Sequence, residues 1–508
     1  MVAPLAPETA NRRTGRALFL LALGIYLVTA GGSLTSTDAV VSFDLTASLV
    51  ERGSIALSSN LTGSNALEGV DGRYYSPFGI AQSVWDAPFY LFGRAITAAG
   101  VRIGKPDSVP KALVALSQTL LGAAIVWLTF RLGLAVAASR AAAGWAALTL
   151  AIGSLLWPYA RFGFNQPLAC ATLLAAVLSI IEGVRHDDRR RIRRAGWWFA
   201  AALLTRHEIM IAMLPLAAWL WWAGQPTAAI RAKRLRALAP GVAAGLAFWL
   251  VYNWIRFGNP LEPGYLRDPV PGFGASVVAG VTGLLFSPGG SILLYSPFAA
   301  FGIWGLWREI RGGDRAVAWL FASLIATFLL FYGQLGNWTG WRAYGPRYLL
   351  ITLPYFAAGF ALWLRTLTAR QLRAAGVAVC LTGFVVQWPG VLMDYAKVSQ
   401  ADAVARGRQP TRLELQWGWR ESMLARNTAA AVIAVPANVR YVAGIESPPH
   451  VPAPAGPDDR GFSQQLSFSL DWWWLYLFYL GVVPRLALPA IVAAALIWIV
   501  YWSRRLAF

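Results

Sequence analysis

The stretch ALVALSQTLLGAAIVWLTFRLGL, residues 112–134, is one of many long apolar segments in this chain. A helix of about 20 such residues spans the hydrocarbon core of a bilayer. Segments of this kind recur from end to end of the 508 residues, of which 57% are hydrophobic and only 13% are charged. Soluble domains carry about twice that charged fraction. The sequence therefore predicts an all-α polytopic membrane protein that lies in a lipid bilayer.

The net charge of +20 is distributed in a way that indicates orientation. The basic residues fall mainly in short clusters between apolar segments, and RHDDRRRIRR (185–194) is the densest of them. Such clusters stay on the cytoplasmic side of a membrane. We therefore interpret the charge as a topology signal and expect no nucleic-acid partner. The only cysteines, Cys170 and Cys380, lie within apolar segments and form neither a metal motif nor a disulfide framework.

Counting outward from this cluster predicts about twelve transmembrane helices with both termini in the cytoplasm. Residues 35–111 would form one large external loop, with helices at the membrane interface that include 74–96. We expect three regions: a transmembrane region 1–391, an external loop or small subdomain 392–470, and a last helix with a cytoplasmic tail, 471–508. The expected helices lie near 17–34, 112–134, 141–158, 168–184, two within 196–223 (with Arg206, His207 and Glu208 near their turn), 237–255, 290–307, 316–333, 348–365, 372–391 and 474–502.

The stretch NWTGWRAYGPRYLLITLP (337–354) places Arg342 and Arg347 where an external loop enters a helix. Trp341 beside them is typical of a membrane interface. In one interpretation the two arginines reach outward to lipid phosphates. In the other they hold a bound phosphate, because guanidinium groups bind phosphate through two parallel hydrogen bonds and a helix N-terminus adds a favourable dipole. The spacing leaves both interpretations open.

Asp38 follows the first helix closely, near the expected membrane surface. A carboxylate in partly apolar surroundings can act as a general base toward an acceptor hydroxyl. An aspartate can equally cap the helix expected to begin near Val41. Asp44 lies six residues further on. We interpret Asp44 mainly as part of a solvated helix face and keep it as the next candidate base.

Six motifs, in order over residues 20–365, resemble the GT-C glycosyltransferases that use polyprenyl-phosphate sugars, such as protein O-mannosyltransferases and lipid A aminoarabinose transferases. Asp38 takes the place of the first acidic residue of that family, whereas Ala39 replaces the second, which weakens any two-carboxylate or metal-bridging role. The motifs are TDAVVSFDLTASLVERGSIAL (37–57), DGRYYSPFGIAQSVWDAPFYLFGR (71–94), YARFGFNQPLA (159–169), NWIRFGNPLEPGY (253–265), LLYSPFAAFG (293–302) and GWRAYGPRYLLITLP (340–354).

The resemblance implies a GT-C fold with its catalytic region in 1–391, in the cytoplasmic membrane of a bacterium, with the active site on the external side. The donor would be a polyprenyl-phosphate sugar and the acceptor a glycan, glycolipid or protein hydroxyl. Asp38 would be the base of an inverting transfer, and Arg342 and Arg347 would bind the donor phosphate. Further substrate-binding candidates are Asp44, Arg73, Tyr74, Tyr75, Asn165, Gln166, Tyr265 and Trp341.

No metal site is expected, because the three histidines are scattered, although some members of the family use a divalent cation. The competing class is a polytopic transporter or a flippase for lipid-linked sugars. Transporters usually show internal repeats and short external loops. This chain shows no evident repeat and has two large predicted external loops, near its two ends, which favours the glycosyltransferase.

Overall fold

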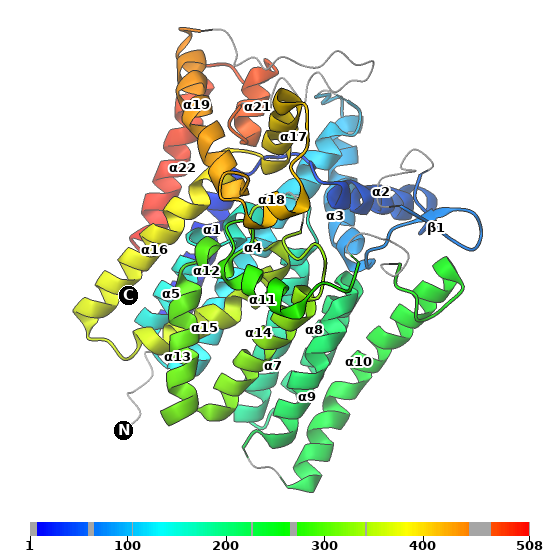
Figure 1. Cartoon of the computed structure of the whole chain (residues 1–508), viewed down its shortest axis with the longest axis vertical. Helices are drawn as coiled ribbons and strands as arrows, with labels where there is room; N and C mark the ends of the chain where they lie inside the picture. Colours follow the sequence, from blue (N-terminus) through cyan, green and yellow to red (C-terminus); the bar gives the residue numbers. More distant parts are fainter. Residues whose placement is uncertain are drawn as a thin grey trace.

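A computed structural model describes residues 8–58, 66–103, 105–224, 227–264, 272–340, 343–446 and 469–506. Within this part the regular structure is helical except for one short antiparallel hairpin, which pairs β1 (Leu67–Glu68) with β2 (Tyr74–Tyr75). The prediction of an all-α protein is therefore confirmed. Figure 1 shows long helices bundled side by side, with shorter helices gathered at the upper end.

The helices of the first half are α1 (Glu8–Thr29), α2 (Thr37–Arg52), α3 (Ala81–Ala98), α4 (Ser108–Ala137), α5 (Arg140–Ile152), α6 (Leu156–Tyr159), α7 (Gln166–Arg185), α8 (Arg189–Thr205), η2 (His207–Ala212), α9 (Met213–Trp222) and α10 (Ala228–Phe257). Those of the second half are α11 (Val277–Phe286), α12 (Ile292–Tyr295), α13 (Phe298–Gly312), α14 (Arg315–Gly333), η3 (Arg347–Thr352), α15 (Leu353–Leu364), α16 (Ala369–Leu392), α17 (Tyr395–Arg406), α18 (Arg412–Trp417), α19 (Met423–Ala443), α21 (Trp473–Tyr479) and α22 (Ala487–Ser503).

Six of the described helical units are long and apolar enough to cross a membrane: α4, α7, α10, α14, the continuous unit η3–α15, and α16. All six fall on predicted spans. The other predicted segments also contain helices, but these are shorter or less uniformly apolar. The total of about twelve spans therefore stays a prediction.

The structure corrects several predicted boundaries. The expected single helix 474–502 is wrong, because α21 ends at Tyr479 and α22 begins at Ala487. Gly481 with φ +72° and Pro484 lie between them, and neither continues a helix. The segments 141–158 and 290–307 are likewise each divided into two helices.

Helices also lie between the predicted spans. The stretch between the predicted spans 237–255 and 290–307 contains α11, and the described part of 392–470, predicted as an external loop or small subdomain, contains α17, α18 and α19. Short local signals explain one of these, since Thr411 and Glu414 form a reciprocal capping box at the start of α18. The segment 35–111, predicted as an external loop, contains the helices α2 and α3, and Figure 1 shows α2 lying across the direction of the bundle.

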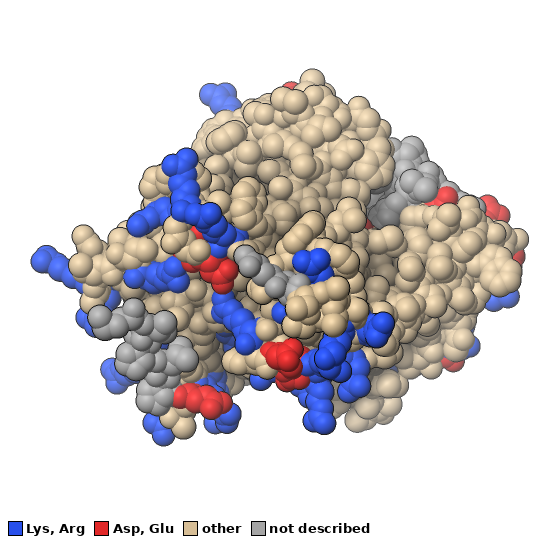
Figure 2. Space-filling model, turned by 90° about the horizontal axis from the view of Figure 1, so that it is seen from below, with Lys and Arg blue, Asp and Glu red and all other residues tan. Residues whose placement is uncertain are grey.

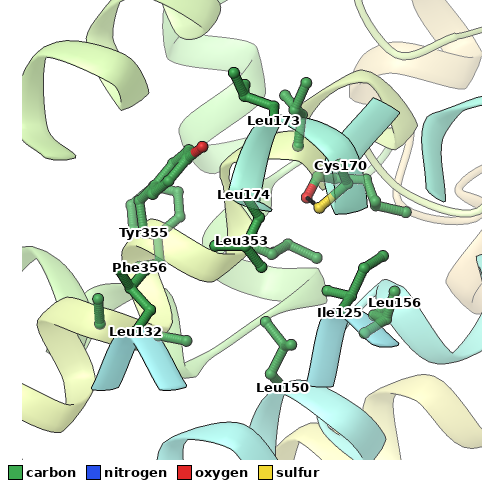
Figure 3. Packing of buried hydrophobic residues seen from close by; sticks show 14 of the residues in the cluster. Ile125, Leu132, Leu150, Leu156, Cys170, Leu173, Leu174, Leu353, Tyr355 and Phe356 are labelled. Atoms are coloured by element: carbon green, nitrogen blue, oxygen red, sulfur yellow. Dashed lines mark hydrogen bonds between the residues drawn. The ribbon is translucent and has the colours of Figure 1, made fainter. Parts of the chain in front are cut away.

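The centre of the bundle is a dry core built around α7. Figure 3 shows Leu173 and Leu174 of α7 among Leu353 and Tyr355 of α15 and Ile125 of α4. The cost of burying a polar group keeps such a centre apolar.

Helices α13 and α15 approach closely through glycines. A Cβ atom placed on Gly305 would collide with the backbone of Gly359. Larger residues at these positions would force the two helices apart.

The two ends of the bundle differ in charge. The arginine-rich start of α8 lies at the lower end in Figure 1, and Figure 2 shows Lys and Arg gathered on this face. Helix α7 connects that end to the other, and its 20 residues correspond to about 30 Å. The first residues of α7 therefore lie about one membrane thickness away from the basic cluster.

Candidate active site

Asp38 and Arg347 form an ion pair at the upper end of the bundle. Arg347 Nη1 donates to Asp38 Oδ2 at 3.0 Å, although 309 positions separate the two residues. Both side chains are largely buried, with 16% and 13% of their surface exposed. Asp38 lies in the first turn of α2, but the cap of that helix is Ser36, whose hydroxyl accepts from the Ala39 N–H at 3.1 Å. The capping interpretation of Asp38 is therefore wrong.

Aromatic rings and one glycine hold the Arg347 guanidinium. Its carbon lies 5.2 Å from the ring centres of both Phe164 and Tyr348, within the range of cation–π contacts. Gly340 has φ +79°, and a Cβ atom there would lie 2.8 Å from Arg347 Nε. Within the described residues Arg347 Nε is buried without a hydrogen-bond partner. These contacts fix the orientation of the guanidinium, and its Nε–H can still donate a hydrogen bond to a ligand.

A second ion pair lies beside the first. Arg206 Nε donates to Glu208 Oε1 at 2.5 Å, and Arg206 Nη1 donates to Asn165 Oδ1 at 2.7 Å. The Tyr332 hydroxyl donates to Glu208 Oε1 at 2.9 Å. Tyr348 connects the two pairs, because its ring stacks on Tyr332 at 5.0 Å and lies 5.8 Å from the Arg206 guanidinium. Two buried ion pairs therefore share one aromatic wall.

The predicted residues Asn165 and Gln166 belong to this site. Asn165 precedes α7 and binds Arg206, and Gln166 is the first residue of the helix. One turn further along, Cys170 Sγ lies 3.7 Å from Leu350 O of η3, so the first turns of α7 and η3 lie side by side. Gln166 is only 3% exposed.

Other predicted residues make contacts within the segment 35–111. Asp44 accepts from Ser58 N at 2.7 Å and from the Ser58 hydroxyl at 2.9 Å. The Tyr75 hydroxyl donates to Asp71 at 2.7 Å, a bond that lowers the pKa of Asp71, while burial and this bond raise the pKa of Tyr75 to about 12. Arg73 is an exposed partner of Asp71 at 3.2 Å.

Tyr74 packs against the apolar cluster that includes Val41, Leu45 and Phe78. The role of Tyr74, like that of Asp44, Arg73 and Tyr75, in substrate binding stays a prediction. Arg342, Trp341 and Tyr265 lie outside the described residues.

The site contains residues that the sequence-based site prediction omitted, chiefly Arg206 and Glu208. Their signal was a charged pair between two apolar helices, and such residues usually carry a function. The sequence predicts only that both residues lie near the turn between these helices. His207 places this turn beside the segment between β2 and α3: its Nδ1 accepts from Trp249 Nε1 at 2.7 Å, so Nε2 carries the proton and donates to Pro77 O at 3.2 Å.

Tyr395, the first residue of α17, was also missed. Its ring packs against Phe162 at 5.6 Å and Tyr159 at 6.3 Å. Burial raises the pKa of Tyr395, and the nearby charge of Arg347 opposes that shift. The region after 392, predicted as an external loop or small subdomain, thus contributes Tyr395 to the aromatic residues that line the site.

The donor set of the site does not fit a divalent cation. Asp38 already binds Arg347, and its neighbour is Ala39. Among the described residues no three His, Cys, Asp or Glu side chains form a group that could hold a metal ion. We therefore assign no step of any reaction to a metal.

Comparisons with known proteins yield structural similarity only. No protein-family model matches the sequence, and no curated protein sequence matches it. The chain is similar to ArnT from Cupriavidus metallidurans in the apo state, with 15% identity over 90% of this chain and 84% of that chain and a TM-score of 0.49. For ArnT bound to undecaprenyl phosphate the identity is 13%, the coverage the same and the TM-score 0.46.

The chain is also similar to the Archaeoglobus fulgidus oligosaccharyltransferase in the apo form, with 12% identity and a TM-score of 0.49. That match covers 80% of this chain and 59% of the other. At these values the GT-C architecture stays a prediction from the sequence motifs.

Proposed function

We propose that the protein is a membrane glycosyltransferase that moves a sugar from a polyprenyl-phosphate carrier to a hydroxyl acceptor. The single observation that carries the proposal is the ion pair of Asp38 with Arg347. The motifs assigned a base to one of these residues and a phosphate anchor to the other, and the chain brings the two into contact across 309 positions. The resemblance of the motifs to GT-C enzymes supplies the reaction class.

The chemistry follows from the two side chains. The donor phosphate binds Arg347 through Nε and displaces the Asp38 carboxylate from Nη1. The freed carboxylate takes the proton of the acceptor hydroxyl as the oxygen attacks the anomeric carbon. The bond between that carbon and the phosphate oxygen breaks, and polyprenyl phosphate leaves with the electron pair. One displacement inverts the anomeric configuration.

Arg347 stabilises the charge that develops on the leaving phosphate. Removal of one such donor typically costs about 3 kcal/mol of transition-state stabilisation. The aromatic surroundings strengthen this effect, because a partly buried guanidinium is not screened by water.

The site belongs to the external side of a bacterial cytoplasmic membrane in this proposal. The supporting feature is its place at the end of α7 remote from the arginine-rich start of α8, which the charge rule assigns to the cytoplasm. Lipid-linked sugars are the form of activated sugar available on that side.

A cell-free transfer assay tests the proposal. Purified protein is mixed with radiolabelled polyprenyl-phosphate sugars and a membrane extract, and Asp38→Asn is compared with Asp44→Asn, since Asp44 binds Ser58 and is the other candidate base. We expect transfer by the wild type and by Asp44→Asn, and loss of transfer in a folded Asp38→Asn. Transfer that survives Asp38→Asn would move the base elsewhere. Unaltered lipid-linked sugar that crosses proteoliposomes would instead indicate a flippase.

A further inference from the structure

The side chain of Gln166 is unusual among the buried polar groups of the site. It is 3% exposed, and neither its Nε2 nor its Oε1 has a hydrogen-bond partner within the described residues. The neighbouring Asn165, by contrast, binds Arg206 at 2.7 Å. A buried amide with both ends unbonded destabilises the fold, and buried polar groups without partners call for an explanation.

The position of Gln166 points to a ligand. It begins α7, and the Asn165 side chain does not cap that helix. Pro167 has no N–H and Ala169 N donates to Asn165 O, so within this first turn only the backbone N–H groups of Gln166 and Leu168 lack an acceptor inside the helix. The parallel first turn of η3 begins with Arg347, whose Nε is also buried without a partner. The unbonded groups thus gather at adjacent helix starts, next to the proposed phosphate anchor.

The charges of the site define the chemistry of that ligand. Asp38 pairs with Arg347, and Glu208 pairs with Arg206, so the charges of these described residues cancel. The unbonded side chain of Gln166 is neutral and offers one donor group and one acceptor. A carboxylate would use only the donor, and an ammonium group only the acceptor. Hydroxyl groups use both.

We propose, on the basis of the proposed function, that Gln166 binds the hydroxyl groups of an uncharged sugar on the polyprenyl-phosphate donor. The sugar completes the hydrogen bonds that the buried amide lacks. At the ring position that it contacts, Gln166 therefore favours a hydroxyl group over a carboxylate or an ammonium group. Its own contribution is to substrate binding, and the proton transfer and phosphate binding belong to Asp38 and Arg347.

Binding measurements on the full-length protein in lipid nanodiscs test this inference. The probes are undecaprenyl phosphate alone and the same lipid carrying glucose, mannose, arabinose, glucuronic acid or 4-aminoarabinose. Affinity is read from tryptophan quenching, and stability from thermal unfolding. The variant is Gln166→Leu, and the matched control is Gln118→Leu, because Gln118 is a buried glutamine of α4 whose Oε1 also lacks a partner.

We expect the wild type to bind the best neutral-sugar lipid about tenfold more tightly than bare undecaprenyl phosphate, as two hydrogen bonds can provide. Gln166→Leu should lose this preference, keep its affinity for the bare lipid, and unfold at or above the wild-type temperature. Gln118→Leu should keep the preference. A preference that survives in Gln166→Leu, or a wild type that prefers a charged sugar, overturns the inference alone. Absence of binding to every lipid overturns the proposed function as well.

Discussion

Two buried arginines near the same end of the bundle, Arg161 and Arg347, differ in how completely they are bonded. The Arg161 guanidinium has no exposed surface and donates to Thr29 O, to Gly390 O at 3.2 Å, and to both the backbone and the carboxylate of Asp471. Arg347 has one ion pair and an unbonded Nε. Arg161, whose donors are bonded within the protein, joins chain segments. Arg347, which keeps an unbonded Nε, can bind a ligand.

The surroundings of Arg161 support its structural role. Lys397 Nζ lies 3.8 Å from Asp471 and 3.7 Å from Asp394, and donates to the Tyr476 hydroxyl at 2.9 Å. Burial raises the pKa of Asp394. These contacts tie the end of α1, the end of α16 and the start of α21 to the loop that carries Phe164 and Asn165. Both arginines are charged and largely buried. The number of hydrogen bonds that each one makes within the protein distinguishes the structural Arg161 from Arg347, which can bind a ligand.

The largest expected effect is on stability, at Arg161. Arg161→Met leaves Asp471 buried with a more distant cation and three carbonyl groups without their donor. We expect a loss of about 3–5 kcal/mol in the free energy of unfolding, measured by thermal or denaturant unfolding in detergent. A loss below about 1 kcal/mol would show that Arg161 does not join the segments and would break the comparison.

The next effect is on catalysis, at Arg347. Arg347→Gln should lower the transfer rate at least about a hundredfold, which corresponds to about 3 kcal/mol. Its unfolding temperature should fall less than that of Arg161→Met, because the Asp38 carboxylate that loses Arg347 keeps 16% of its surface exposed, whereas Asp471 keeps none. Arg131→Gln is the control, since Arg131 pairs with Glu182 on α7 near the other end of the bundle. Equal transfer by Arg347→Gln and Arg131→Gln would contradict the assignment.

Asp86 is a buried carboxyl group outside the site that, like Arg347, makes few hydrogen bonds. It accepts from Gln82 at 2.9 Å, and burial raises its pKa to about 8. The unfolded chain releases this proton near pH 4. The folded state therefore holds a proton that the unfolded state lacks between about pH 4 and 8, and stability falls as the pH rises through this window.

We expect the wild type to lose about 2.5 kcal/mol of stability between pH 5 and pH 7 through this group. Asp86→Asn should lose correspondingly less over the same range. Unfolding curves at several pH values measure the difference, with transfer activity as a second readout that should not change. An identical pH dependence in the two proteins would show that Asp86 is ionised in the fold.

The smallest effect is expected at Tyr75, whose hydroxyl donates to Asp71 in the segment between α2 and α3. Tyr75→Phe removes one hydrogen bond to a partly exposed carboxylate and should cost about 1 kcal/mol of stability. If Tyr75 serves only the loop, KM and kcat should not change. A raised KM for either substrate would instead support the prediction from the motif that Tyr75 binds substrate.

The sequence predicted the parts of the molecule that depend on local patterns. The apolar segment 112–134 predicted α4 well, because a continuous run of apolar residues determines both the helix and its burial. Asp38 and Arg347 were found through short motifs. Breaks such as the one between α21 and α22 were missed, since Gly481 and Pro484 act within a segment that is otherwise uniformly apolar.

The rest of the site depends on contacts between distant segments. Arg161 stands in the motif YARFGFNQPLA (159–169), and its partner Asp471 lies 310 positions away. Nothing local distinguishes its role from that of Arg347. Arg206 and Glu208 likewise could not be assigned to the site from local sequence, because their contacts with Asn165 and Tyr332 form only in the folded chain.

The most direct test of the account measures whether a polyprenyl phosphate stabilises the protein through Arg347. Undecaprenyl phosphate is added to the purified wild type, to Arg347→Gln and to Arg131→Gln, and the unfolding temperature is recorded as a function of lipid concentration. Binding to the folded state alone raises that temperature, and the rise at a given lipid concentration is larger for tighter binding. The account predicts a concentration-dependent rise in the wild type and in Arg131→Gln, and its loss in Arg347→Gln. An equal rise in all three proteins would contradict the assignment of Arg347 as the phosphate anchor.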